Sequence, residues 1–283
     1  MTYKILIPTD FSDNAFNAIN YAFTLFKKKP CEFLILHTYY HSGMDRENLI
    51  VPEPSKEECD RIISQAENNM KILEGKVRGT THNEKHRLNF VTRFGQFYKV
   101  MNETAKEEQI NLIVMGTKGK SNKKSAIFGS NTLNVIEEVR SCPVFAIPSG
   151  YAFKNPNEIV FPTSFRTHYK KEEMKKLVDI ARITKATIRI LHIQNNGNLT
   201  ERQEENKKTL EAILLPATFT HHRLYDIKVN DGVRTFIQSR ESEMIAMVNK
   251  KHNFFGSIFS NPMIKELGMH TEIPLLAMHD SRE

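Results

Sequence analysis

The stretch that decides the fold is Leu112–Val135, LIVMGTKGKSNKKSAIFGSNTLNV. Its first four residues form a short branched apolar run, which is typical of a buried parallel strand. The run stops at Gly116, and Gly119 and Gly129 complete a G-x2-G-x9-G-S spacing. Apolar residues then recur at the spacing of one helical face, at Leu133, Ile136 and Val139. The stretch therefore predicts a strand, a glycine-rich loop and a helix.

This loop follows the carboxyl end of a strand, which is where open α/β sheets bind ligands. Glycines let the backbone approach phosphate oxygens without a Cβ in the way, and free N–H groups at a helix start favour an anion. Ser130, Asn131 and Thr132 add short polar side chains at that helix start. The glycines could also be loop punctuation alone. The lysines at 118, 120, 123 and 124 suit either a solvated loop or counter-charges for phosphates.

The rest of the first 150 residues alternates strands with helices. Lys4–Pro8 predicts a strand, and Ser12 or Asp13 can cap the helix after it. Further strands are predicted at residues 32–37, 89–94 and 143–148, with helices between them. Five strands alternating with four helices predict a doubly wound α/β domain, with parallel strands and both sheet faces covered.

The chain then repeats itself, which predicts two tandem five-stranded domains at 1–150 and 151–283. Three pairs of segments match: residues 4–11 with 158–165, residues 32–37 with 187–192, and residues 143–147 with 274–278.

The second copy departs from the first where a ligand would bind. Ser164 answers Asp10, and we expect Asn249 and His252 to stand in place of the first two glycines. A Cβ at these places would crowd a phosphate, and the nearby Phe254, Phe255 and Phe259 suit packing better than anion contact. We therefore expect the second copy to bind no nucleotide.

Composition excludes several classes of protein. The 283 residues contain no apolar run of about 20, the length that spans a bilayer, and no signal-peptide pattern follows Met1. These features predict a cytoplasmic protein that does not bind membranes. The net charge of +7 is spread over both copies without a basic stripe, which argues against nucleic-acid binding. The three cysteines predict no disulfide framework, with Cys31 and Cys142 as buried thiols, and no cluster of metal ligands is evident.

Two motifs carry a resemblance to a known family. The opening I-L-I-P-T-D-F-S-x-x-A, which begins at Ile5, and the glycine loop together resemble ATP-binding universal stress proteins. Both halves are similar to domains of that family, which implies an adenine nucleotide alpha-hydrolase-like fold. The resemblance implies ATP, with or without Mg2+, as the ligand. It places Thr9, Asp10 and the neighbourhood of Thr38 around adenine and ribose. Around ribose and phosphates it places Met115, Gly116, Lys118, Gly119, Gly129, Ser130, Asn131 and Thr132.

The family also commonly dimerises through the last strand of each domain. In a duplicated chain, we expect residues 143–148 to pair internally and antiparallel with 274–278, which would hide two sheet edges. Whether two chains form a homodimer stays open. Asp10 could equally be a turn residue at a strand end. His37 recurs as His192 in the half without the glycine site, which favours a structural role for both.

The function expected is a nucleotide-responsive regulator that acts through an unidentified protein partner. The chain contains no G-x-x-x-x-G-K-[ST], S-G-G-x-D-S or H-x-G-H motif, and no base for activating water is identifiable, so we expect no enzyme, or at most slow ATP hydrolysis. The alternative is a scaffold of the same fold that binds no nucleotide. A phosphotransfer or hydrolytic enzyme is a third interpretation.

Overall fold

The computed structural model describes residues 2–44, 54–80, 82–117, 129–194, 197–249 and 272–279. The first half comprises β1 (Tyr3–Pro8), α1 (Asp13–Leu25), β2 (Cys31–Tyr39), a 3-10 turn η1 (Ser42–Met44), α2 (Lys56–Thr80), β3 (His86–Phe94), α3 (Phe97–Glu107), β4 (Leu112–Gly116), α4 (Ser130–Glu138) and β5 (Val144–Ile147). The second half comprises β6 (Glu158–Pro162), α5 (Lys171–Thr184), β7 (Thr187–Gln194), α6 (Glu201–Leu214), β8 (Phe219–Tyr225), α7 (Val229–Arg240), β9 (Met244–Asn249) and β10 (Leu275–His279).

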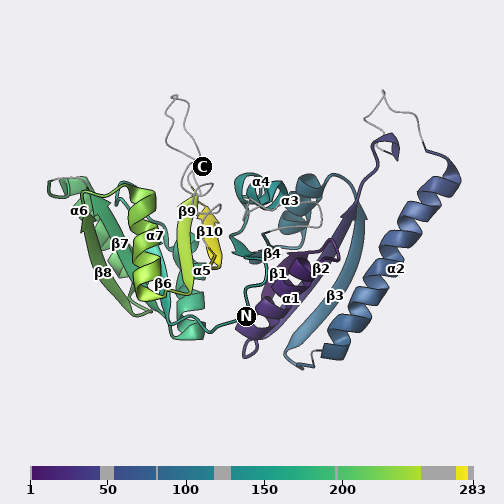
Figure 1. Cartoon of the computed structure of the whole chain (residues 1–283), viewed down its shortest axis with the longest axis horizontal. Coiled ribbons are helices and arrows are strands. Elements are labelled where there is room, and N and C mark those ends of the chain that lie inside the picture. Colours follow the sequence, from purple (N-terminus) through teal and green to yellow (C-terminus); the bar gives the residue numbers. More distant parts are fainter. Residues whose placement is uncertain are drawn as a thin grey trace.

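All ten of these strands form one sheet, in the order β3-β2-β1-β4-β5-β10-β9-β6-β7-β8. Within each half every neighbouring pair is parallel. Figure 1 shows the first half, in purple to teal, beside the second half, in green, with the yellow β10 between them. The predicted pair of five-stranded, doubly wound α/β units is therefore confirmed.

The two halves meet at β5 and β10, which are the only antiparallel neighbours in the described sheet. Leu275, Leu276 and Ala277 pair with Ala146, Phe145 and Val144 respectively. All of these side chains are fully buried. The predicted internal pairing of the last strands is therefore confirmed, and it leaves β3 and β8 as the outer strands of the described sheet.

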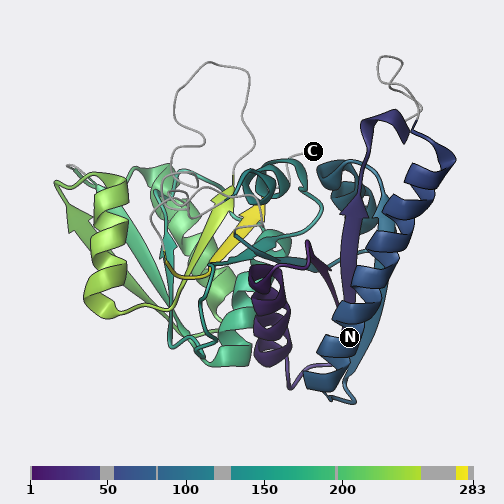
Figure 2. The same ribbon diagram turned by 45° about the vertical axis from the view of Figure 1, so that its right-hand side comes forward.

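Helices cover both faces of this sheet and build one core on each face (Figure 2). One core holds apolar residues of α1, α2, α5 and α6, and the other holds residues of α3, α4 and α7. Each core contains residues from both halves, so the packing is continuous across the junction. Among the described helices, none has the length and apolarity needed to cross a membrane.

The structure decides two local predictions, one about a helix cap and one about the cysteines. Ser12, rather than Asp13, caps α1, because its hydroxyl accepts a hydrogen bond from Ala15 N at 3.1 Å. Cys31 and Cys142 are buried, as predicted, and burial raises the pKa of each thiol to about 12. Both cysteines are therefore protonated at neutral pH.

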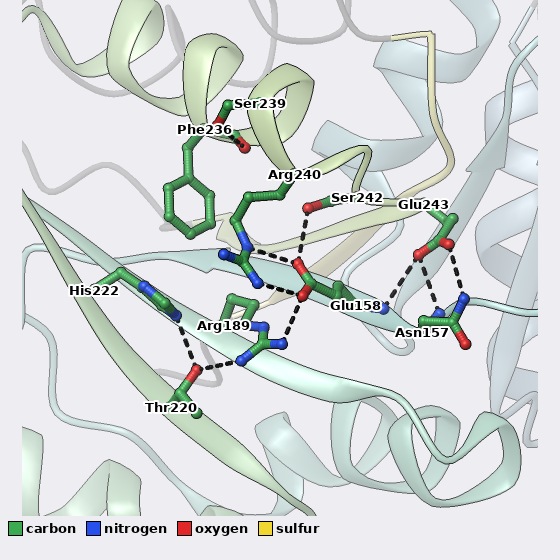
Figure 3. A network of polar contacts seen from close by, with 10 residues as sticks. All are labelled: Asn157, Glu158, Arg189, Thr220, His222, Phe236, Ser239, Arg240, Ser242 and Glu243. Carbon is green, nitrogen blue, oxygen red and sulfur yellow. Dashed lines mark hydrogen bonds and ion pairs between the residues drawn. The ribbon is translucent and has the colours of Figure 1, made fainter.

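A polar network joins the strands of the second half at the amino end of β6 (Figure 3). Glu158 accepts hydrogen bonds from Arg240 Nε at 2.8 Å, from Arg240 Nη2 at 2.5 Å and from Arg189 Nη2 at 2.5 Å. These two guanidinium groups, Arg240 first, hold the pKa of Glu158 at about 2 despite its partial burial. Beside it, Glu243 accepts from the backbone N–H groups of Asn157 and Glu158 at 3.0 and 3.2 Å. The network thus ties α7, β6, β7 and β9 together.

We predict that Glu158→Gln destabilises the chain at neutral pH by about 1–2 kcal/mol, after allowance for solvent screening of the arginines. The folded-state pKa lies below the unfolded one, so this contribution is present above about pH 4.5 and is lost as the pH falls toward 2. Urea unfolding of wild type and variant across pH 2–7 measures the difference in the free energy of unfolding. A difference that stays constant over that range would contradict the prediction.

A fragment ending at residue 150 is predicted to self-associate. Without β10, the fully buried Val144, Phe145 and Ala146 of β5 would become an exposed, flat, apolar strand edge. Light scattering on the purified fragment should give a dimer or larger species. A stable monomer at concentrations of about 100 μM would show that β5 does not need its partner strand, because edge pairing of this kind acts in that range.

Candidate functional site

A cavity of about 320 Å3 opens at the carboxyl ends of the first half's central strands. This volume is within the range of small-molecule sites. Nine of the predicted site residues line it: Thr9, Asp10, Thr38, Met115, Gly116, Gly129, Ser130, Asn131 and Thr132. Lys118 and Gly119 lie outside the described residues. The structure therefore brings together every predicted site residue that it describes.

Asp10 is held on this cavity by a tight turn at the end of β1. Phe11 has a left-handed backbone (φ 61°), which is costly for a bulky side chain. Three contacts stabilise it. Thr9 Oγ1 accepts from Phe11 N at 3.0 Å, Asp10 Oδ1 accepts from Ser12 N at 3.1 Å, and the rings of Phe11 and His37 lie 4.3 Å apart. The structure thus places Asp10 both in this turn and on the lining of the cavity.

The second half contains the same turn without the acid. Phe165 is also left-handed (φ 55°), and its N–H donates to Thr163 Oγ1 at 3.0 Å. His192 Nδ1 donates to Thr163 O at 2.8 Å, as His37 Nδ1 does to Thr9 O at 2.8 Å. Because the two histidines make the same bond in both halves, this contact serves the turn. The main difference between the turns is Asp10 against Ser164.

The other wall of the cavity is formed by the end of β4 and the start of α4. Gly129 N donates to Thr117 O at 2.5 Å, and Thr132 Oγ1 donates to Gly116 O at 3.1 Å. These bonds fix the start of α4 against the end of β4. Gly129 is the N-cap of α4 and has no side chain to accept from the first turn. Thr132 N already donates to Gly129 O at 3.1 Å. The N–H groups of this turn that suit an anion in the cavity are therefore those of Ser130 and Asn131, together with the positive end of the helix dipole.

Sequence reasoning missed part of the lining. Ala15, Tyr40, Phe97 and Thr117 also face the cavity. Thr117 is fully buried, and its hydroxyl has no hydrogen-bond partner within the described part of the chain. Its position directly after Gly116, at the end of the strand, was the available signal. Tyr40 and Phe97 lie just beyond the ends of strands, where the apolar pattern alone gave no reason to select them.

Strand pairing corrects the expected alignment of the second copy. Ile5 pairs with Leu112, and its counterpart Ile159 pairs with Met244. Counting along β4 and β9 from these pairs makes Val248, not Asn249, the residue of the second half that is equivalent to Gly116. Asn249 is equivalent to Thr117. The prediction that Asn249 replaces the first glycine was wrong by one residue, because the sequence does not show where β9 ends. His252 and the phenylalanines at 254, 255 and 259 lie outside the described residues.

Contacts from α6 hold the corresponding turn in the second half. Gln203 Nε2 donates to Ser164 O at 2.8 Å, and the buried Asn206 donates to Phe165 O at 2.8 Å. The Thr163 hydroxyl also bonds to the hydroxyl of Tyr169. Here the turn's polar groups are used by the protein itself.

No group of three or more potential metal-ligating side chains occurs among the residues that the structure describes. In the lining of the cavity, Asp10 is the one carboxylate among those residues. Together, the parallel sheet, the cavity at its carboxyl edge and the helix start facing that cavity define a doubly wound α/β protein with a candidate ligand site.

Comparison with known sequences places the chain within this class. Residues 1–148, just over half of the chain, match the Universal stress protein family. The protein therefore belongs to the universal stress protein family, and its two halves make it a tandem member.

Two relatives align with about half of this chain over most of their own length. Universal stress protein MJ0577 of Methanocaldococcus jannaschii is 25% identical over 150 residues, which cover 49% of this chain and 90% of that protein. Universal stress protein YxiE of Bacillus subtilis is 26% identical over 151 residues, which cover 52% of this chain and 99% of that protein. A solved universal stress protein from Archaeoglobus fulgidus superposes over 98% of both chains with a TM-score of 0.74 and 12% identity. That likeness shows the tandem fold.

Gly116 is predicted to be required for packing. A Cβ at this residue would lie 2.6 Å from Asn14 Nδ2 and 3.0 Å from the backbone oxygen of Asn14, which is on α1. Gly116→Ala should therefore destabilise the protein by about 1–3 kcal/mol in urea unfolding. Gly75→Ala is the control, because Gly75 lies within α2 with open space at its Cβ, and that change should be stabilising. Equal effects of the two variants would rule out the steric explanation.

Proposed function

We propose that the first half binds an adenine nucleotide, with ATP as the expected ligand, and that the protein acts as a nucleotide-responsive regulator. The observation that carries this proposal is the helix start: α4 has the bare N-cap Gly129, and Ser130 and Asn131 of its first turn line a nucleotide-sized cavity. Membership of the universal stress protein family supports it, since the two motifs in this chain resemble that family's ATP-binding branch.

In this proposal the phosphates lie against Gly129, Ser130 and Asn131 at the start of α4. Adenine and ribose lie toward the ends of β1 and β2, beside Asp10 and Thr38. The Thr117 hydroxyl, which is buried and has no partner among the described residues, gains a hydrogen bond when the ligand is present. Lys118 and Gly119 remain proposed contacts, as does Mg2+ as a companion of ATP.

The consequence of binding would be a shift between two conformations of the α4 region, in proportion to the ligand's difference in affinity for them. The proposal includes no chemical step, because the sequence offers no identifiable base for activating water. A protein partner would then distinguish the two conformations. The site is proposed to act inside the cytoplasm, where ATP is abundant.

A second candidate, a scaffold that needs no nucleotide, is favoured by one observation. The absence of a side chain at Gly116 is already explained by the close approach of Asn14, without any phosphate. Gly116→Val is therefore a poor test of ligand binding, because it would disturb the packing of α1 under either hypothesis. A substitution at Gly129 distinguishes nucleotide binding from a nucleotide-independent scaffold better than one at Gly116.

Titration of the whole chain with ATP, ADP, AMP and adenosine by calorimetry tests the proposal. We expect saturable binding of one nucleotide per chain, weakening as phosphates are removed. Gly129→Val should lower the affinity by roughly tenfold or more, equivalent to about 1.4 kcal/mol, because its side chain would crowd the phosphates. The backbone at Gly129 (φ −75°, ψ 160°) accepts valine, so the fold should be retained.

Ser164→Val serves as the control, because Ser164 lies in the second half at the position equivalent to Asp10. This variant should leave the ATP affinity unchanged. No heat and no rise in melting temperature up to millimolar ATP would refute nucleotide binding. Two nucleotides per chain would instead show that the second half also binds.

A further inference from the structure

The carboxyl end of β9 in the second half is bonded to the end of α4 in the first half. Asn249 Nδ2 donates to Ile136 O at 2.9 Å, and Arg140 Nη2 donates to Asn249 O at 2.8 Å. Asn249 is only 4% exposed, so its side-chain amide is shielded from bulk water. This residue therefore holds α4 through both its side chain and its backbone.

Helix α4 needs outside support more than most helices. It has nine residues, fewer than the roughly 12–15 that an isolated helix needs for marginal stability in water. Its N-cap glycine provides no side-chain cap, and its last carbonyl groups have no partners within the helix. The Asn249 amide supplies a partner for one of these carbonyls, that of Ile136. Asn249 thus acts as a C-terminal cap donated by the other half.

Apolar packing alone would not fix the position of α4 along its axis. Val135, Ile136 and Val139 pack into the core that also contains β9 and β10, but burial of apolar surface is non-directional. A hydrogen bond to a buried carbonyl is directional, and leaving that carbonyl unsatisfied is costly. The bond from Asn249 therefore fixes the carboxyl end of α4 along its axis, while the bonds of Gly129 and Thr132 hold its start against β4.

The two halves use this strand position differently. Thr117 stands in the first half where Asn249 stands in the second, and it faces the cavity instead of bonding across the junction. The second half has Ser164 in place of Asp10, and Val248 at the position equivalent to Gly116. It has an asparagine at the next position that reaches the first half's helix.

We infer that Asn249 is a positioning residue for the nucleotide site, and that the second half serves as a clamp that presents α4 to the phosphates. This inference rests on the proposed function, because it assigns the start of α4 to the ligand. By thermodynamic reciprocity, nucleotide at the start of α4 stabilises the bonds at Asn249. The site and the end of β9 are then coupled through a helix of nine residues.

The test compares Asn249→Leu with Asn206→Leu. Both asparagines are buried to a similar degree, and each donates one side-chain hydrogen bond to a backbone carbonyl, at 2.9 and 2.8 Å. Asn206 makes its bond within the second half, away from α4. Amide hydrogen exchange of α4 is measured in the ligand-free protein, and ATP affinity is measured by calorimetry. Arg140→Met removes the second bond at a less buried site and replaces Asn249→Leu if that variant does not fold.

Both asparagine variants should lower the melting temperature. Only Asn249→Leu should speed exchange in α4 and weaken ATP binding, by about 3- to 10-fold, the equivalent of one net hydrogen bond. Unchanged α4 exchange, or equal loss of affinity in the two variants, would overturn the inference. If the wild-type chain binds no ATP, the proposed function fails by itself, and the exchange data still decide whether Asn249 holds α4.

Discussion

The antiparallel contact between β5 and β10 is the constraint on which the rest of this structure depends. In the whole chain β5 and β10 are short, apolar and fully buried. In either half alone, this strand would be an exposed sheet edge, and edges of that kind associate. Pairing the two edges within one chain gives a continuous ten-stranded sheet. On each face of the sheet, it also joins the apolar cores of the two halves into one, so that packing in one half supports elements of the other. The position of α4 against β9 follows from this junction.

Duplication followed by divergence explains which features are shared and which are not. The left-handed turn at Phe11 and Phe165, with its threonine and histidine contacts, is the same in both halves. It is a device for ending a parallel strand. Ser164 stands where the first half has Asp10, and α6 side chains hold the second turn through its carbonyl groups. The second half thus keeps the turn that ends its first strand, while the carbonyl groups of that turn accept hydrogen bonds from α6.

The glycines of the loop motif do not share one explanation. Gly116 leaves room for Asn14 of α1 and is a packing residue. Gly129 has an ordinary backbone conformation, so neither φ nor ψ demands glycine, and its bare N-cap facing the cavity is the feature that suits an anion. Reading the motif as a single phosphate-binding unit would merge a structural constraint with a functional one.

The sequence by itself determined the repeat, the alternating strands and helices of the first half, the antiparallel pairing of the last strands and nine of the residues that line the cavity. These followed because apolar periodicity, glycine spacing and recurring segments are local signals. The tertiary structure decided the rest: Val248 at the position equivalent to Gly116, the crowding at Asn14, the lining by Tyr40, Phe97 and Thr117, and the bond from Asn249 to α4. Each of these depends on contacts between residues distant in the chain, whose register and approach are set only when the sheet and its helices pack together.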